Sequence, residues 1–257
     1  MKKSIVFLML SVIFSAGCVS CEKSKNAESA GETGYVSGKV ANTLGQPMAG
    51  AQVYISSDVF FNSGVQTTSD AGGNYKMAIP SINSLRAFAR TLVTYNGRQY
   101  LVYLDPDHPQ SFTSQDKVTC NFRWKLTGTV AGSTVPGDYY GGTVAIYADA
   151  SHLPFPAGDL AAQGNIEFKF EPVGPLIDGS VGQTVTAHAG PPNYSYLYDI
   201  PIGKYKVSAT YQGQALKIRN NRQGSSDSFG SSKELEFVQE GSTANGGPIT
   251  MYLEFSK

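Results

Sequence analysis

Short runs in which apolar and polar residues alternate, separated by turn-forming residues, recur from residue 35 to the end of the chain. In residues 51–56, Ala51, Val53 and Ile55 fall on every second position, which places them on one face of a strand. Asn96-Gly97 stands between two further runs and is a strong signal for a two-residue hairpin turn. No long stretch has the 3.6-residue period of an amphipathic helix, so the sequence predicts an all-β protein.

Composition supports this fold class and excludes two others. The 257 residues include 28 Gly, 15 Tyr and 13 Phe, as expected of a β protein rich in turns and aromatic side chains. Hydrophobic residues make up 41% of the chain, enough to form a core and to argue against disorder. The 20 basic and 20 acidic side chains balance and no basic block occurs, which excludes a protein that tracks nucleic-acid phosphates.

The N-terminus has the order of an export signal. Lys2 and Lys3 precede the apolar run 5–14, which is followed by small residues at 15–17. A run of ten apolar residues is shorter than the ~20 needed to span a bilayer. We therefore expect this segment to be cleaved.

Residues 15–18, Ser-Ala-Gly-Cys, resemble the lipobox of bacterial lipoproteins. The resemblance implies a signal peptide at 1–17 and acylation of Cys18, with Cys21 as a second candidate for the acylated residue. Polar residues without periodicity then predict a flexible tether over 18–34. The expected location is the outer membrane, held by this lipid anchor, on either its cell-surface or its periplasmic face.

Cys120 lies in a run, 118–124, in which Val, Cys, Phe and Trp alternate onto one face. The pattern predicts that Cys120 is a small buried hydrophobic residue rather than a reactive thiol. The few cysteines of the chain do not form a disulfide framework.

The second half of the chain repeats the pattern of the first half. We expect two tandem β-sandwich domains, at 35–124 and 125–257, each large enough to bury its own core. The segment 124–126 lacks Pro and Gly, so we expect a strand to run directly from one domain into the next at a fixed angle. Four pairs of segments occur in the same order in both halves: 36–40 with 126–130, 53–55 with 146–148, 75–80 with 196–201, and 94–97 with 210–213.

The first half resembles the carboxypeptidase regulatory-like domain, a transthyretin-like or Ig-like β-sandwich. The residues that carry this resemblance are 38–40, 45–53, 68–75 and 79–80. The second half resembles the same fold mainly through 196–201 and 203–207, and it lacks the Gly-rich segment found at 45–50. The resemblance implies a non-catalytic module of the kind that recurs in Gram-negative surface lipoproteins, some of them linked to glycan capture.

No catalytic motif accompanies this fold. The sequence contains no His-x-x-Glu, Gly-x-Ser-x-Gly or phosphate-binding glycine loop. We therefore predict a non-enzyme without metal or cofactor. Asp105 and Asp107 have the spacing of possible calcium ligands, and their neighbouring prolines equally suit an ordinary loop.

Aromatic residues in predicted loops are the main candidates for function, because loops of sandwich domains carry binding sites. These rings either cover the ends of the cores and the domain joint, or form a surface that stacks on an extracellular ligand, with polysaccharide slightly favoured over protein. The candidate contact residues are Phe60, Phe61, Tyr139, Tyr140, Phe155 and Tyr194.

The alternative function is that of a structural or assembly subunit of a cell-surface complex or adhesin. Strand edges of a sandwich can pair with another chain. The C-terminal segment 249–255 alternates cleanly and would pair either within its own sheet or with a neighbouring chain.

Overall fold

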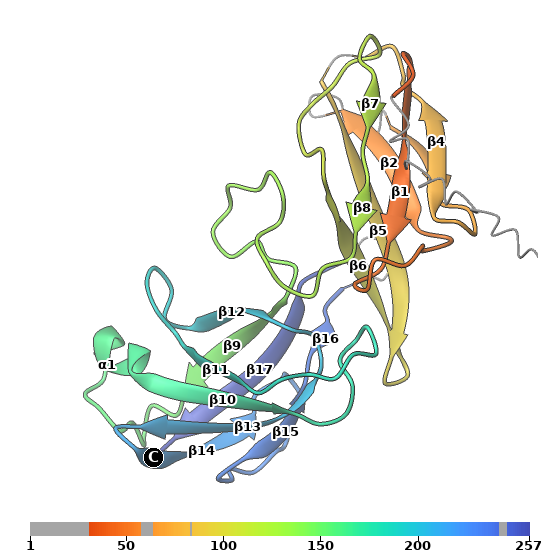
Figure 1. The fold of residues 1–257 in the computed structure, drawn as a ribbon. Helices are drawn as coiled ribbons and strands as arrows, with labels where there is room; N and C mark the ends of the chain where they lie inside the picture. The colour runs from red at the N-terminus through yellow and green to blue at the C-terminus, as the bar shows by residue number, and fades with distance from the viewer. Residues whose placement is uncertain (1–30, 58–63, 83, 242–245) are drawn as a thin grey trace, which may run out of the picture.

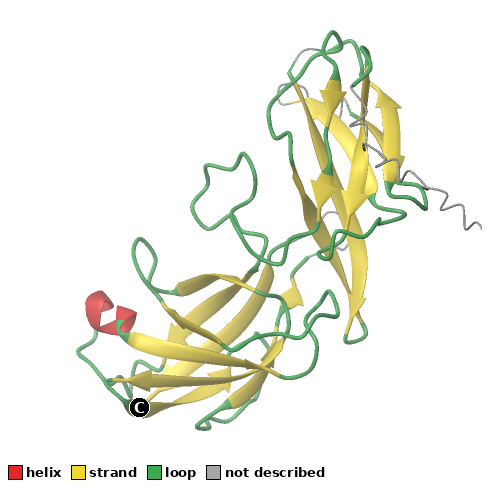
Figure 2. Ribbon diagram, viewed as in Figure 1, coloured by secondary structure: helices red, strands yellow, loops and turns green. Residues whose placement is uncertain are grey.

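The computed structural model describes residues 31–57, 64–82, 84–241 and 246–257. The signal peptide 1–17, Cys18, Cys21, most of the tether, Phe60 and Phe61 lie outside the described residues. Strands dominate, arranged in two domains, and the prediction of an all-β protein with two β-sandwich domains is confirmed (Figures 1 and 2). Within the described part of the chain, no helix has the length and apolar character needed to cross a membrane.

In its described residues, the first domain has eight strands. Their order in the sheet is β3-β2-β5-β6-β8-β1-β4, with β7 paired to β1. The bounds are β1 Tyr35–Ala41, β2 Gln52–Ser57, β3 Val65–Thr68, β4 Asn74–Ala78, β5 Leu85–Tyr95, β6 Arg98–Pro106, β7 Val118–Thr119 and β8 Phe122–Arg123.

The second domain has the same strand order. Its sheet runs β11-β10-β13-β14-β17-β9-β12, with β15 paired to β13 and β16 paired to β17. The bounds are β9 Gly142–Ala148, β10 Ile166–Pro172, β11 Val185–His188, β12 Tyr196–Ile200, β13 Lys204–Tyr211, β14 Gln214–Asn220, β15 Lys233–Glu236, β16 Val238–Gln239 and β17 Ile249–Ser256, with one short helix, α1 Leu160–Gly164.

Matching the two orders confirms the internal repeat and corrects half of its alignment. β4 corresponds to β12, and the β5–β6 turn corresponds to the β13–β14 turn, as the sequence pairs predicted. Both turns place two consecutive residues at positive φ, Asn96-Gly97 and Gln212-Gly213, as a two-residue hairpin requires. However, β1 corresponds to β9 rather than to 126–130, and β2 corresponds to β10 rather than to 146–148.

The expected continuous strand across 124–126 is also wrong. β8 ends at Arg123 and β9 begins at Gly142, with a long loop between them. Gly128, Gly132 and Gly137 all adopt positive φ in this loop, and such turns interrupt a strand. The loop is visible as the light-green excursion between the two domains (Figure 1).

A long hairpin, not a shared strand, fixes the domains to each other. The far end of β5–β6 reaches the second domain (Figure 1). The Tyr95 hydroxyl donates to the Pro175 carbonyl over 2.9 Å, and the Tyr100 hydroxyl donates to the Phe237 carbonyl over 2.8 Å. The Leu101 amide donates to Gln239 Oε1 over 2.7 Å, and Gln239 Nε2 donates to the Leu101 carbonyl over 3.0 Å. Most of the buried hydrophobic side chains of the two domains belong to one continuous cluster.

The C-terminal strand is used inside its own sheet. β17 pairs antiparallel with β14 and parallel with β9 over six residues, Thr250 to Phe255. Its apolar side chains Met251, Leu253 and Phe255 are fully buried. The first of the two pairing expectations for this segment is therefore confirmed, and the strand is not free to pair with another chain.

Cys120 is completely buried, as predicted, and burial raises the pKa of its thiol to about 12. In residues 25–257 it is the only cysteine. Because the thiolate is the nucleophile, a shift from the ordinary 9.0 lowers the reactive fraction at pH 8 by roughly 1,000-fold. We expect Ellman's reagent to react with Cys120 at least a hundredfold more slowly in the native chain than in guanidinium. Equal rates would contradict the burial.

The same shift has a consequence for stability. The unfolded chain releases the thiol proton near pH 9, whereas the folded chain holds it to about pH 12. The folded state therefore binds more protons over this range, and the free energy of unfolding falls as the pH rises above 9.

Candidate functional site

A groove of about 440 Å³ lies between the two domains and is called here the interdomain groove. One wall is the outward face of β5 and β6 in the first domain. The other wall comes from the loop between β8 and β9 and from residues 247–249, which lead into β17. Aromatic side chains from both walls line it: Phe88, Tyr103, Tyr139 and Tyr140.

The first wall follows from strand alternation. Ala87, Ala89 and Leu104 point into the core and are buried, so the positions between them face outward. Phe88 and Tyr103 occupy such positions and keep 37% and 43% of their surface exposed. Two large aromatic side chains are thus presented to solvent where polar residues would ordinarily stand.

A third ring supports this wall from the neighbouring strand. Tyr54 of β2 pairs in register with Phe88, and their rings stack with centroids 5.6 Å apart. Burial and the nearby Tyr103 hydroxyl raise the pKa of Tyr54 to about 12. Arg90 lies over the Tyr54 ring at 5.5 Å and is bonded to Gln52, so the rings are held in place.

The second wall is held by one carboxylate. Asp199 lies in an irregular part of β12 with φ at 64°, and its oxygens accept from the Gly128 amide over 2.8 and 2.9 Å. The Gly141 amide also donates to Asp199, over 3.2 Å. Both ends of the loop segment that carries Tyr139 and Tyr140 are therefore tied to the second domain.

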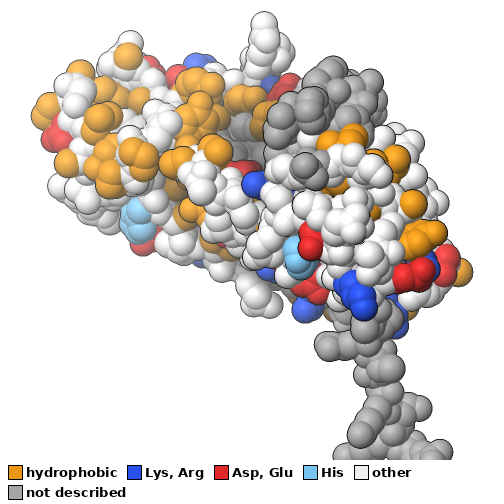
Figure 3. All heavy atoms as spheres, turned by 90° about the horizontal axis from the view of Figure 1, so that it is seen from above, with side chains coloured by type: hydrophobic (Ala, Val, Ile, Leu, Met, Phe, Trp, Pro, Cys, Tyr) orange, Lys and Arg blue, Asp and Glu red, His pale blue; other side chains and the backbone are white. Residues whose placement is uncertain are grey.

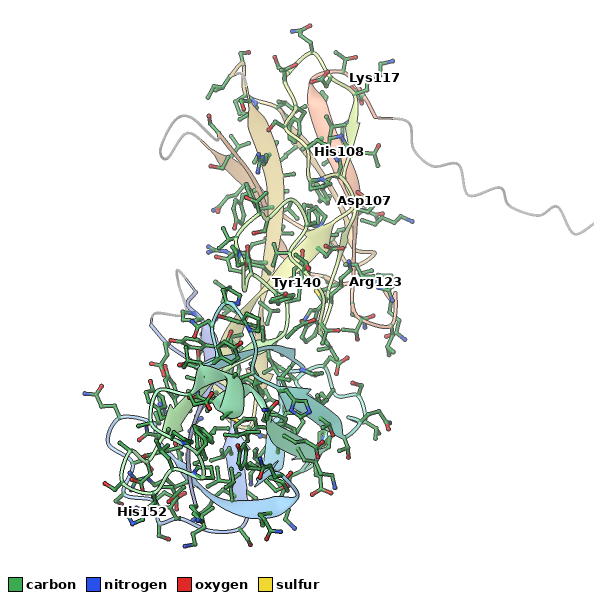
Figure 4. All side chains as sticks on the ribbon, turned by 90° about the vertical axis from the view of Figure 1, so that its left-hand side faces the viewer. Asp107, His108, Lys117, Arg123, Tyr140 and His152 are labelled. Carbon is green, nitrogen blue, oxygen red and sulfur yellow. The ribbon has the colours of Figure 1, made fainter. Side chains whose placement is uncertain are left out.

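Tyr140 ties the same loop to the first domain. Its hydroxyl donates to Asp105 over 2.8 Å, and the Lys125 ammonium lies 2.6 Å from the other Asp105 oxygen. Burial raises the pKa of the Tyr140 hydroxyl, which stays protonated as a donor. Figure 4 shows Tyr140 at the junction of the two domains. The residue therefore serves the domain joint and offers only part of its ring to the groove.

These contacts also explain the two carboxylates considered as calcium ligands. Asp105 binds Tyr140 and Lys125, whereas Asp107 accepts from the backbone and side-chain amides of Asn121, each over 2.7 Å. The two carboxylates thus serve separate protein partners. Among the residues that the structure describes, no three His, Cys, Asp or Glu side chains gather as a possible metal site.

Two predicted contact residues lie elsewhere in the second domain. Phe155 packs on the core, with its ring 5.3 Å from that of Tyr211 and 6.2 Å from that of Phe255. Tyr194 is half-buried beside the end of α1, where its carbonyl accepts from Gln163. Neither residue lines the interdomain groove. For Phe155 the structure matches the interpretation that loop rings cover a core.

Phe88, Tyr103 and Tyr54 were not among the predicted contact residues because they lie on strands rather than in loops. The signal that could have found them is the alternation of β5 and β6. The solvent-facing positions of β5 and β6 carry Phe88, Leu92 and Tyr103. Three large apolar side chains are unusual on an outward strand face.

Removal of the Asp199 carboxylate should loosen the second wall. The variant Asp199→Ala leaves the partly buried Gly128 amide without its acceptor, a loss of about 1–3 kcal/mol in the free energy of unfolding. We expect proteases to cleave within 128–141 several times faster than in the unaltered chain. Asp178→Ala, which removes a carboxylate bonded to Thr43 and Ser180 away from the groove, serves as the control. Equal cleavage of this loop in both variants would contradict the positioning role.

The chain matches no protein-family model and no curated protein, so the resemblance to the carboxypeptidase regulatory-like domain stays a prediction. Among solved structures it is similar to the Bacillus anthracis TIE protein, at 13% identity and a TM-score of 0.31. That match covers 87% of this chain and 34% of the other, so this chain spans about a third of that protein's length.

Two further similar structures are pilus proteins. The major pilin protein T-13 from Streptococcus pyogenes is 10% identical, with a TM-score of 0.27 and coverage of 88% of this chain and 96% of the other. The C-terminal fragment of the pilus adhesin SpaC from Lactobacillus rhamnosus GG is 11% identical, with a TM-score of 0.21 and coverage of 87% and 97%.

Proposed function

We propose that this protein is a non-enzymatic binding protein of the cell envelope that holds an extracellular polysaccharide in the interdomain groove. The observation that carries the proposal is the groove itself, whose exposed Phe88, Tyr103 and Tyr139 rings come from both domains. Its volume of about 440 Å³ falls in the range of ligand sites that are mostly apolar with a few polar groups.

The chemistry of the lining suits a sugar. The C–H face of a sugar ring is apolar and packs on an aromatic ring, while its hydroxyls need hydrogen-bonding groups at the rim. Arg86 and Asp138 stand among the lining residues and supply a donor and an acceptor. An open groove between fixed walls can bind such a ligand without rearranging the domains.

The proposed location follows from the N-terminal segment. Acylation of Cys18 would place the two domains at the outer membrane on a polar tether, either at the cell surface or facing the periplasm. The lipid anchor alone would then hold the interdomain groove at the membrane, where extracellular polysaccharide can reach it.

An assembly subunit is the second candidate, and the exposed sheet edges favour it. Among the described strands, β3 pairs only with β2, and Val65 at its start keeps 39% of its surface exposed. An edge strand of this kind can accept a strand from another chain. Recovery of the anchored protein from mild detergent with one stoichiometric partner would support this candidate.

Affinity electrophoresis tests the main proposal. Residues 25–257, which keep every described residue, are run through gels containing neutral polymers (galactomannan, xyloglucan, laminarin, arabinoxylan, starch) and charged ones (alginate, polygalacturonate). We expect retardation by at least one neutral polymer class. Unchanged mobility in every gel would overturn the polysaccharide proposal and favour the assembly function.

A further inference from the structure

We propose that the interdomain groove continues over the outer face of the second domain as a row of stacked tyrosines. The site would therefore bind an extended internal stretch of a neutral polysaccharide rather than a chain end. This inference rests on the proposed function, and it adds a binding surface and a ligand length to it. The row, called here the tyrosine ladder, consists of Tyr139, Tyr198 and Tyr196.

The ladder begins inside the groove. Tyr139 lines the groove and keeps 38% of its surface exposed. Its ring centroid lies 6.0 Å from that of Tyr198, at an interplanar angle of 31°. Tyr198 in turn stacks on Tyr196, with centroids 5.9 Å apart and an angle of 23°. The three rings thus form one row that leads out of the groove along β12.

The backbone is shaped to present this row. Gly137 approaches the Tyr198 ring so closely that an added Cβ would lie 2.9 Å from it, and its φ of 89° also favours glycine. The loop therefore packs on the ring and carries Tyr139 alongside it. The register shift in β12 between Leu197 and Ile200 includes Tyr198, the middle ring of the ladder.

The floor beside the ladder is built from a small residue. Tyr196 pairs in register with Ala145 of β9, and Ala145 pairs with Tyr252 of β17, so all three share one face of the sheet. Ala145 is 4% exposed while Tyr196 remains 36% exposed. The small Ala145 side chain thus lies between the Tyr196 and Tyr252 positions on this face of the sheet.

Two ion pairs lie in the second domain near the ladder, and the Asp199 carboxylate of β12 accepts from the Gly128 and Gly141 amides. Glu254, on the same outward face of β17, binds Arg219 over 2.7 Å, and Arg222 lies 3.5 Å from Glu240. Paired charges leave no strong field for a charged polymer, which is why we assign a neutral one. Hydrophobic side chains gather over the second domain in the view from above (Figure 3).

The length of the polysaccharide fragment is the variable that distinguishes binding along the tyrosine ladder from binding in the groove alone. The probe is the neutral polymer that retards residues 25–257, hydrolysed and separated by size, with affinity measured by titration calorimetry. For the unaltered chain we expect affinity to rise with fragment length beyond the shortest fragments that bind. Removal of ladder rings should abolish this rise.

The test variants are Tyr196→Ala and the pair Tyr196→Ala/Tyr198→Ala. The single variant keeps the Tyr198–Gly137 contact, so the loop stays packed. We expect Tyr196→Ala to lose roughly fivefold in affinity for long fragments, as expected for one lost stacking contact, and little for the shortest ones, and we expect the double variant to lose more. Tyr35→Ala, at a tyrosine of equal exposure (37%) on β1, is the matched control.

Each outcome decides the inference. Loss confined to long fragments supports the tyrosine ladder. Unchanged affinity of both ladder variants at every length overturns it and leaves groove binding in place. Retardation by charged polymers alone overturns the neutral assignment, and no binding of any polymer overturns the ladder together with the proposed function.

Discussion

Replacing both Phe88 and Tyr103 by alanine should lower the affinity for the retarding polysaccharide by about 5- to 150-fold. Each exposed ring is expected to contribute about 0.5–1.5 kcal/mol of stacking, and a tenfold change in affinity corresponds to 1.4 kcal/mol. The two residues lie on the outward face of β5 and β6, so the core beneath them keeps its packing. The measurement is affinity electrophoresis over a range of polymer concentrations.

Leu92→Ala is the control for this pair. Leu92 also faces outward on β5 and is 51% exposed, but it does not line the interdomain groove. Its replacement should leave both the affinity and the thermal midpoint nearly unchanged. Unaltered binding by the Phe88/Tyr103 variant would place the ligand elsewhere.

Tyr100→Ala should have the largest effect on stability. Tyr100 is fully buried where the hairpin meets the second domain, and its ring lies 6.2 Å from that of Tyr95 in an edge contact. Truncation of a buried aromatic residue costs about 3–5 kcal/mol in the free energy of unfolding. It also leaves the Phe237 carbonyl without its donor. We expect a lower midpoint in urea and separate unfolding of the two domains.

Tyr100→Phe separates the hydrogen bond from the packing. It keeps the ring and removes only the hydroxyl, so the loss should be about 1–3 kcal/mol. Calorimetry of the unaltered chain should show one transition, because the buried cluster is continuous across the domains. Two well-separated transitions in the unaltered chain would contradict the fixed joint.

The sequence predicted those parts of the fold that depend on neighbouring residues. The Asn96-Gly97 turn needs only two consecutive residues at positive φ, and the burial of Cys120 follows from the alternation of residues 118–124, which continues across the break between β7 and β8. The correspondence of β4 with β12 was predictable because segments 75–80 and 196–201 both begin with Tyr and end with Ile-Pro.

Long-range pairing was not predictable in the same way. Residues 126–130 share a Gly and a Val with β1, but the place of β1 in the sheet is taken by β9, which pairs in parallel with the last strand. Nothing local distinguishes the two segments. Only the pairing of β9 with β17, about a hundred residues later in the chain, decides between them.

In the candidate site, too, features that depend on neighbouring residues were predictable and those that depend on distant contacts were not. Tyr139 was found because it stands in a Gly-rich loop, whereas Phe88 and Tyr103 lie on strands whose outward face matters only once the second domain stands opposite. Tyr140 was predicted as a contact residue, yet its hydroxyl is bound to Asp105, 35 residues away. Neither partner carries a sequence signal for the other.

Hydrogen–deuterium exchange with and without the retarding polysaccharide tests the central claim most directly. If the interdomain groove holds the polymer, protection must appear together in 86–104 of the first domain and in 130–141 of the second. Protection confined to one domain, or centred on residues 153–156 and 191–194, would contradict a site shared between the domains.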